Sequence, residues 1–131
     1  MIVEFAQEFG IHPNLYANLI KLESWTYDVS LCPDGPVTPS CTSYAGALGM
    51  AQVMYYNFGC SSPDDCEIGR DPRTNLRKGA EIFADYLARK GGDWRMGLAA
   101  YHGGPNRFPY REIDWQYADQ ILAWYWESEN E

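Results

Sequence analysis

The sequence predicts an all-α, or nearly all-α, single domain that covers residues 1–131. Apolar residues recur with the 3.6-residue period of helices along nearly the whole chain, and no strand-like alternation is sustained. A length of 131 residues suits one domain with its own core. Hydrophobic residues make up 46% and charged residues 21%, which argues against a disordered, collagen-like or coiled-coil chain.

Two helices are predicted near the N-terminus, the first ending at Gly10 and the second beginning at Pro13. Their apolar stripes comprise Ile2, Phe5 and Phe9 in the first, and Leu15, Leu19 and Leu22 in the second. Residues 31–45 are rich in Pro, Gly and Ser and predict a loop. A short helix is expected over about 46–57, followed by a second loop that contains two cysteines.

Three further helices are predicted in the second half of the chain. Asp71 followed by Pro72 combines an N-cap with proline at the first helical position, and this helix should end at the glycine pair 91–92. Asp93 caps a shorter helix that ends at the next glycine pair, and the last helix covers about 113–127. The apolar positions comprise Leu76, Ala80, Phe83 and Leu87, then Trp94, Leu98 and Tyr101, then Tyr117, Ile121 and Trp124.

The four cysteines allow three pairings. Cys32 and Cys41 bracket one turn-rich stretch, and Cys60 and Cys66 bracket another, which favours two local disulfides and an oxidising destination. The alternative is four reduced thiols in a cytosolic protein. The cysteine spacings do not match zinc ligand pairs and the two histidines lie far from them, so we expect no metal and no cofactor.

The charge balance excludes some classes of partner. The net charge of −8, from 18 acidic and 10 basic residues, argues against a nucleic-acid binder. Residues 70–111 carry nine bases and four acids, a local balance of +5, which indicates a solvated helix face more than a polyanion site. No apolar run approaches the ~20 residues that span a bilayer, so we expect no membrane insertion.

Glu23 is the first candidate for chemistry. It lies at the edge of an apolar stripe, and no Lys or Arg stands three or four residues away; those neighbours are Leu19, Ile20, Thr26 and Tyr27. A carboxyl held against apolar surface has a raised pKa and can act as a general acid. The alternative is a glutamate at a helix end that faces water.

Two other segments suggest a site. In residues 43–54, Gly46 and Gly49 allow close backbone approach, and the Gln52 amide suits sugar hydroxyl and acetamido groups. A tightly packed helix of small residues is the alternative. Residues 99–104, which contain Tyr101 and His102, are the second candidate segment. The alternative interpretation is a helix end with a glycine cap, where His102 contacts the last carbonyls.

Taken together, these segments resemble a known family. Glu23-Ser24, Gly49–Gln52 and Ala100–His102 resemble, in order, the Glu-Ser, Gly-Leu-Met-Gln and Ala-Tyr-Asn motifs of the soluble lytic transglycosylase (SLT) family. Residues 9–13, the helix from Asp71 to Leu87, and Tyr117 also match its pattern. The resemblance implies a lysozyme-like single domain, here with a disulfide-braced loop insertion, that cleaves peptidoglycan glycan strands.

The resemblance also implies a mechanism with one carboxyl. Glu23 would protonate the glycosidic oxygen between N-acetylmuramic acid and N-acetylglucosamine, and then accept the proton of the muramic C6 hydroxyl that attacks C1. The product is a 1,6-anhydro sugar, and no water is consumed. Most glycosidases instead use two carboxyls about 5–10 Å apart.

Other site residues follow from the same resemblance. Ser43 and Gln52 match positions that contact sugar or the catalytic carboxyl, Met54 matches a methionine that lines the groove, and Tyr101 and Tyr117 match tyrosines near the glutamate. A core aromatic is the alternative for Tyr117.

The chain departs from the family at three points. Met50-Ala51 replaces Leu-Met, and His102 replaces the Asn of Ala-Tyr-Asn, which alters a sugar contact and adds a titrating group. The segment between Glu23 and Ser43 is longer than usual and contains the first cysteine pair, so we expect a flap beside the groove.

Two other functions stay open at this stage. A lysozyme-type hydrolase, or muramidase, would use water and a second carboxylate, for which Asp28, Asp34 and Asp114 are candidates. The other possible function is that of a non-catalytic module, which binds glycan or has a structural role in a phage tail or secretion machine. The N-terminus lacks a signal-peptide pattern. With the cysteines, this leads us to expect a periplasmic, extracellular or virion-associated protein, delivered by a larger phage-tail or secretion assembly.

Overall fold

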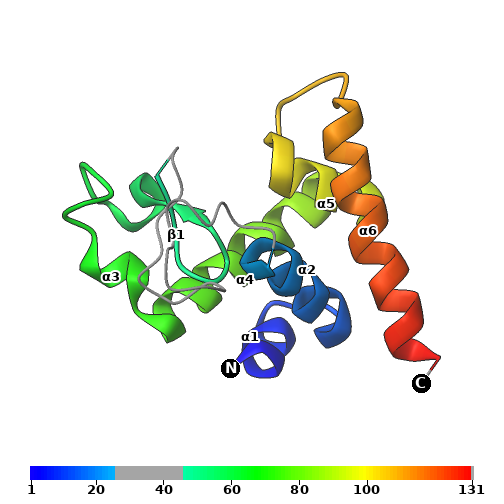
Figure 1. Cartoon of the computed structure of the whole chain (residues 1–131), viewed down its shortest axis with the longest axis horizontal. Coiled ribbons are helices and arrows are strands. Elements are labelled where there is room, and N and C mark those ends of the chain that lie inside the picture. Colours follow the sequence, from blue (N-terminus) through cyan, green and yellow to red (C-terminus); the bar gives the residue numbers. More distant parts are fainter. Residues whose placement is uncertain (26–45, 131) are drawn as a thin grey trace. The chain divides into compact units, whose positions relative to one another are not determined.

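The computed structural model describes residues 1–25 and 46–130. In chain order, the elements are α1 (Ile2–Glu8), α2 (Pro13–Trp25), β1 (Ala47–Leu48), β2 (Val53–Met54), a 3₁₀ helix (Tyr55–Phe58), α3 (Glu67–Arg70), α4 (Pro72–Arg89), α5 (Trp94–Gly103) and α6 (Glu112–Glu129) (Figure 1). Helices dominate these residues, as the sequence predicted. None of the described helices is long and apolar enough to cross a membrane.

The chain divides into two compact units. The first unit comprises Met1 and Ile20–Gly79, and the second comprises Ile2–Leu19 and Ala80–Glu131. Buried apolar side chains fill each unit. Those of the first include Ile20, Leu22, Leu48, Ala51, Val53 and Leu76, and those of the second include Phe5, Leu15, Leu19, Phe83, Leu98 and Ile121.

The helix ends follow the local signals in the sequence. Gly10 has a φ of +73°, a left-handed conformation that favours glycine, and the Ile11 amide donates to the Ala6 carbonyl at 2.8 Å to close α1. Asp71 accepts hydrogen bonds from the Thr74 amide and hydroxyl, each at 2.9 Å, at the start of α4. The carboxylate of Asp93 caps α5 by accepting from the Met96 amide at 3.0 Å. These predicted starts and ends are confirmed.

The helix expected over 46–57 is wrong. Strands β1 and β2 form an antiparallel hairpin there, with Ala47 opposite Met54 and Leu48 opposite Val53, and a 3₁₀ helix follows. Gly49 and Gln52 have φ values of +67° and +51°, which a right-handed helix does not accommodate. The apolar spacing in this segment therefore reflects a hairpin with one buried and one half-buried residue in each strand.

The Asn75 side chain in α4 holds this hairpin. It is 1% exposed, and its Nδ2 donates to the carbonyls of Leu48 at 2.7 Å and Gly69 at 2.9 Å. Its Oδ1 accepts from the Ala51 amide at 2.9 Å. A Cβ at Gly49 would lie 2.6 Å from the Asn75 amide, so this turn needs glycine for space as well as for conformation. One side chain thus joins α4, the hairpin turn and the end of α3.

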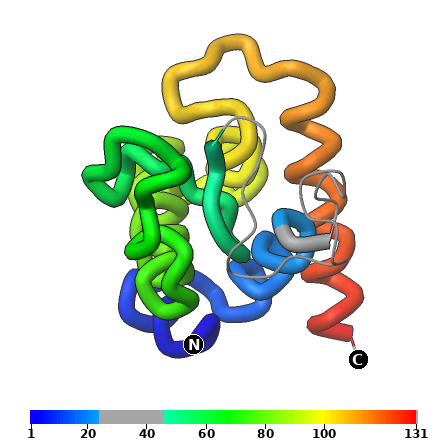
Figure 2. Tube along the Cα trace, turned by 60° about the vertical axis from the view of Figure 1, so that its left-hand side comes forward, coloured from blue at the N-terminus to red at the C-terminus, as the bar shows by residue number. Residues whose placement is uncertain are grey.

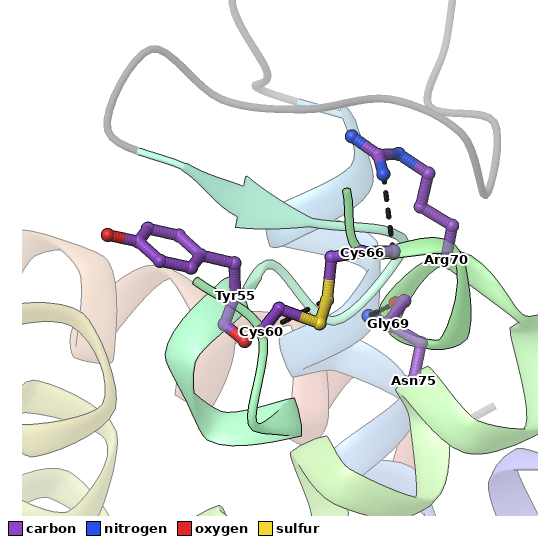
Figure 3. The surroundings of a disulfide bond; sticks show 6 residues. All are labelled: Tyr55, Cys60, Cys66, Gly69, Arg70 and Asn75. Atoms are coloured by element: carbon purple, nitrogen blue, oxygen red, sulfur yellow. Dashed lines mark hydrogen bonds between the residues drawn. A yellow bond between two sulfur atoms is a disulfide. The ribbon is translucent and has the colours of Figure 1, made fainter. Parts of the chain in front are cut away.

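A disulfide joins Cys60 and Cys66, with their Cα atoms 5.6 Å apart (Figure 3). Cys66 is fully buried and precedes α3, and Arg70 Nη1 donates to the Cys66 carbonyl at 3.2 Å. The predicted local pairing of these two cysteines is confirmed. The predicted pair Cys32 and Cys41 lies outside the described residues, as does the 31–45 loop.

Helices α5 and α6 pack against each other in the second unit. Figure 2 follows the chain from α5, in yellow, through the 104–111 connection into α6, in orange and red. Helix α6 begins one residue earlier and ends two residues later than the sequence predicted. The predicted apolar position Ile121 is fully buried and Tyr117 is 9% exposed, whereas Trp124 is half-buried.

We expect Asn75→Asp to lower the free energy of unfolding by about 2–4 kcal/mol. The substitution preserves size but replaces the Nδ2 donor with an oxygen that faces two carbonyl oxygens. Denaturant titration measures the change. The control Asn57→Asp, at an exposed position, should change stability by less than about 0.5 kcal/mol. Equal effects of the two substitutions would contradict this role for Asn75.

We expect the double variant Cys60→Ala with Cys66→Ala to lose about 2 kcal/mol of stability, because the crosslink no longer restricts the unfolded chain. Denaturant unfolding under non-reducing conditions measures the loss, with exposed Ser61→Ala in the same loop as the control. An unchanged midpoint in the double variant would show that the disulfide contributes nothing to stability.

Candidate functional site

Glu23 lies in the last turn of α2, in the first unit, and its residue is half-buried. Ile20 and Leu22 beside it in the sequence are 5% and 8% exposed. Glu23 therefore lies half-buried in a helix that buries these two apolar neighbours, and its function as a general acid stays a prediction. The candidate residue Ser43 and the candidate acids Asp28 and Asp34 lie outside the described residues.

Gln52 occupies the turn between β1 and β2. Its φ of +51° is uncommon for a residue with a side chain, and such backbone conformations cluster at functional sites. The Gln52 amide and its Nε2 both donate to the Gly49 carbonyl, at 3.1 and 2.8 Å. These bonds fix the side chain, and within the described part of the chain Oε1 accepts no hydrogen bond. An amide oxygen in this state can accept from a sugar hydroxyl.

Met54 and Tyr101 are the other half-buried candidates. Met54 lies in β2, opposite Ala47. Tyr101 lies in α5, and its ring meets those of Phe83 and Tyr86 edge-on, with ring centroids 5.9 and 6.5 Å apart. The α4 aromatics therefore position Tyr101 within the second unit.

His102, Asp114 and Tyr117 are brought together in the second unit. His102, in the last turn of α5, places Nδ1 2.7 Å from Asp114 Oδ1 in the first turn of α6. The His102 ring stacks on the Tyr117 ring, with centroids 4.6 Å and planes 26° apart. Thus His102 does not merely cap the end of its own helix, because its side chain contacts the next helix. We call these three residues the His102 cluster.

Asp114 is held from several sides. Its side chain is completely buried, and it accepts from the Arg111 amide at 2.9 Å, from Arg111 Nε at 3.1 Å and from Arg111 Nη2 at 3.0 Å. Burial alone would raise the pKa of Asp114, but the hydrogen bonds from Arg111 and His102 bring this pKa well below its usual range. The carboxylate is therefore ionised at neutral pH.

This environment bears on the hydrolase alternative. A second catalytic carboxylate must reach the sugar or a water molecule beside it. Asp114 has no exposed side-chain surface, and both of its oxygens accept hydrogen bonds from the protein. It is therefore a structural partner of His102 and Arg111 and is unsuited to attack a sugar.

The link between His102 and Asp114 was not predicted from the sequence. The available signal was Asp114 at the third position of a helix, where an acidic side chain commonly bonds the backbone before that helix. The N-cap here is Arg111, which is not a usual capping residue, so the pattern was not recognisable. In the described ranges 1–25 and 46–130, no three His, Cys, Asp or Glu side chains gather as metal ligands.

We expect Asp114→Asn to lower stability by about 2–3 kcal/mol at neutral pH, because hydrogen bonds to charged groups are lost. The folded state lowers the pKa of Asp114, so its contribution is present above the unfolded pKa of about 4 and is lost as the pH falls below that value. The difference between wild type and variant should therefore shrink in acid. Denaturant unfolding as a function of pH measures it, with exposed Asp65→Asn as the control. A difference that stays constant with pH would contradict this interpretation.

Comparison with solved structures gives the fold. The chain is similar to an inactive mutant of the lytic transglycosylase Slt from Pseudomonas aeruginosa, in which a glutamate is replaced by glutamine, with a TM-score of 0.69 and 20% sequence identity. The match covers 98% of this chain and 24% of that protein, so this chain spans about a quarter of its length. The similarity assigns a lysozyme-like helical fold, as predicted.

Comparison with family models identifies the family. The model of the transglycosylase SLT domain matches residues 1–114, which include every described element up to the start of α6. The match covers most of the chain and spans all three motifs noted in the sequence. The chain therefore belongs to the transglycosylase SLT domain family.

Proposed function

We propose that this protein is a peptidoglycan lytic transglycosylase that cleaves the β-1,4 bond between N-acetylmuramic acid and N-acetylglucosamine. The observation that carries the proposal is the SLT family match, together with a half-buried Glu23 at the position of the family's Glu-Ser motif. The substrate is the glycan strand of peptidoglycan, and the reaction uses neither a metal nor a cofactor.

In the first step, the Glu23 carboxyl donates its proton to the glycosidic oxygen as the bond from that oxygen to C1 of the muramic sugar breaks. Positive charge develops on the muramic ring. Glu23 is then a carboxylate and accepts the proton of the C6 hydroxyl, while O6 of the same sugar forms the new bond to C1. The carboxyl regains its proton, the product is a 1,6-anhydro muramic end, and no water enters.

Two observations support a catalytic glutamate without help from Asp114. Asp114, one of three candidate second acids, is buried and fully hydrogen-bonded by Arg111 and His102. The similar solved structure from Pseudomonas aeruginosa is described as an inactive mutant with one glutamate changed to glutamine, so that protein requires a glutamate for its activity. In this chain we assign that function to Glu23.

Several polar and aromatic groups would hold the substrate. The fixed amide of Gln52 would accept from a sugar hydroxyl through Oε1, and Met54 and Tyr101 would provide half-buried surface for sugar rings. We also assign Ser43, His102 and Tyr117 to substrate binding.

We further propose that the protein works outside the cytoplasm, in the periplasm, the extracellular space or a virion. The Cys60–Cys66 disulfide supports an oxidising compartment. The net charge of −8 gives no attraction to an acidic cell wall, which favours delivery by a larger phage-tail or secretion assembly.

We expect Glu23→Gln to reduce the release of glycan fragments from purified peptidoglycan by about 10²–10⁴-fold, because the proton donor is lost. Circular dichroism should show an unchanged fold. The matched control Glu127→Gln removes an exposed carboxylate from α6 and should retain full activity. Full activity of Glu23→Gln would exclude the mechanism.

Mass spectrometry of the released fragments distinguishes the alternative functions. Products one water lighter than the hydrolysis products carry anhydro ends and identify the transglycosylase. Reducing muramic ends would identify a hydrolase instead. Binding of peptidoglycan without release of fragments by the wild-type protein would indicate a non-catalytic module.

A further inference from the structure

The connection between α5 and α6, residues 104–111, places one aromatic side chain in solvent, and we call this segment the Phe108 loop. Phe108 is 91% exposed, more than any other large apolar side chain in the described part of the chain. Figures 1 and 2 show the connection extending beyond the adjoining ends of the two helices. Single exposed apolar residues are common on protein surfaces, so the surroundings of Phe108 decide its significance.

Two long side chains bind the backbone at the start of the Phe108 loop. Lys90, directly after α4, donates from Nζ to the Pro105 carbonyl at 3.1 Å. Arg107 donates from Nε to the Gly103 carbonyl at 3.1 Å. Both cations therefore lie at the same stretch of backbone, because the two carbonyls that they bind are only two residues apart.

The end of the loop is fixed by aromatic contacts. Tyr110 is 8% exposed, and its hydroxyl donates to the Gly104 carbonyl at 3.2 Å, which joins the two ends of the loop. Its ring meets the Trp115 ring edge-on at a centroid distance of 5.4 Å, and Lys90 Nζ lies 5.3 Å from the centroid of the Tyr110 ring. Arg95 lies over Trp115 at 4.3 Å. The loop is therefore preorganised by α4, α5 and α6, which lowers the entropic cost of binding a ligand.

The two cations of this loop have no counter-charge within the protein. In the described ranges, no carboxylate lies within ion-pair distance of Lys90 or Arg107, and their hydrogen bonds go only to backbone carbonyls. Other exposed arginines of the second unit differ in this respect, since Arg89 pairs with Asp85 at 3.0 Å. Lys90 and Arg107 therefore keep their charge available for an external anion.

The acids at the start of α6 form other contacts. Asp114 is buried and bound by Arg111 and His102, and Glu112 Oε1 accepts from Gln116 Nε2 at 3.4 Å. Physiological salt screens charges beyond about 8 Å, so the local charge of a surface matters more than the net charge of −8. The Phe108 loop thus provides positive charge locally on an acidic chain.

The free groups of the loop indicate the chemistry of a ligand. Arg107 uses only Nε within the described residues, so both Nη groups can donate to a carboxylate in the planar geometry that guanidinium groups favour. The adjacent Phe108 ring offers apolar surface. A matching ligand combines carboxylates with apolar faces. Peptidoglycan has both, because its sugar rings have apolar faces and its muramic and peptide parts carry carboxyl groups.

We propose that the Phe108 loop is a docking site for peptidoglycan, in which Phe108 packs against the strand and Arg107 and Lys90 bind its carboxylates. The inference rests on the proposed function for the choice of ligand. It adds an attachment surface, formed within the second unit, to the candidate site residues. At this surface, the local cations offset the repulsion between an acidic chain and an acidic polymer.

The test measures the Kd of the Glu23→Gln protein for purified peptidoglycan by co-sedimentation, because this variant should leave the strands intact. Adding Arg107→Ala should raise the Kd about tenfold, since charge-assisted hydrogen bonds are lost. Adding Phe108→Ala should raise it about fivefold, since an aromatic contact is lost. Circular dichroism should show that each protein stays folded.

Two matched controls are available in the second unit. Arg89→Ala makes the same change in net charge as Arg107→Ala, but its guanidinium already has Asp85 as a partner. Trp126→Ala removes another exposed aromatic ring, which is 62% exposed in α6. Each control should change the Kd by less than about twofold.

Chemically amidated peptidoglycan separates carboxylate recognition from a change in loop structure. Carbodiimide-activated coupling of ammonia converts carboxyl groups into neutral amides and keeps the strand. The Glu23→Gln protein should bind amidated strands about tenfold more weakly than native ones. Arg107→Ala should add less than about twofold to that loss, because both changes remove the same contacts. Phe108→Ala should still weaken binding to both polymers.

The outcomes separate this inference from the proposed function. Unchanged binding in Arg107→Ala or Phe108→Ala would overturn the inference, as would an equal effect of Arg107→Ala on native and amidated strands. Binding of phosphatidylglycerol vesicles that depends on both residues, with peptidoglycan binding unaffected by them, would assign the loop to a lipid surface and also overturn it. Wild-type protein that does not cleave peptidoglycan, with loop-dependent binding intact, would overturn the proposed function alone.

Discussion

The first unit depends on the three hydrogen bonds of the Asn75 side chain. Hairpins with strands of two residues have few ladder bonds of their own, and this one also contains a non-glycine residue with positive φ, Gln52. Asn75 compensates by fixing the Leu48 carbonyl before the turn and the Ala51 amide within it. The same side chain binds the Gly69 carbonyl, so one residue of α4 holds both the end of α3 and the turn that carries Gln52.

The sequence contained enough information for most helices but not for the hairpin. Asp71, Asp93, Gly10 and Pro13 act through contacts within a few residues, so their helix boundaries were predictable. The hairpin depends on Asn75, which lies 24 residues from its partner Ala51 in the sequence, and local periodicity does not report such a contact. Apolar residues in the 46–57 segment were compatible with either a short helix or a hairpin.

The candidate site shows the same division between local and distant information. Motif spacing predicted Glu23, Gln52 and His102 as site residues, because each lies in a short segment with a family counterpart. The burial of Asp114 and its contact with His102 required two helices to be packed, and sequence pattern alone presented Asp114 only as one more acid. The replacement of an asparagine by histidine was visible in the sequence, whereas its buried partner was visible only in three dimensions.

The close approach of Gly103 to Asp114 restricts how this family member can diverge. Any side chain at position 103 would displace the carboxylate, and loss of the carboxylate would leave His102 and Arg111 without their shared acceptor. Substitutions at 102, 103 and 114 are therefore not independent of one another. Among related chains, a histidine after Ala-Tyr should be accompanied by glycine and a distant aspartate, and these three positions should be gained or lost as a set.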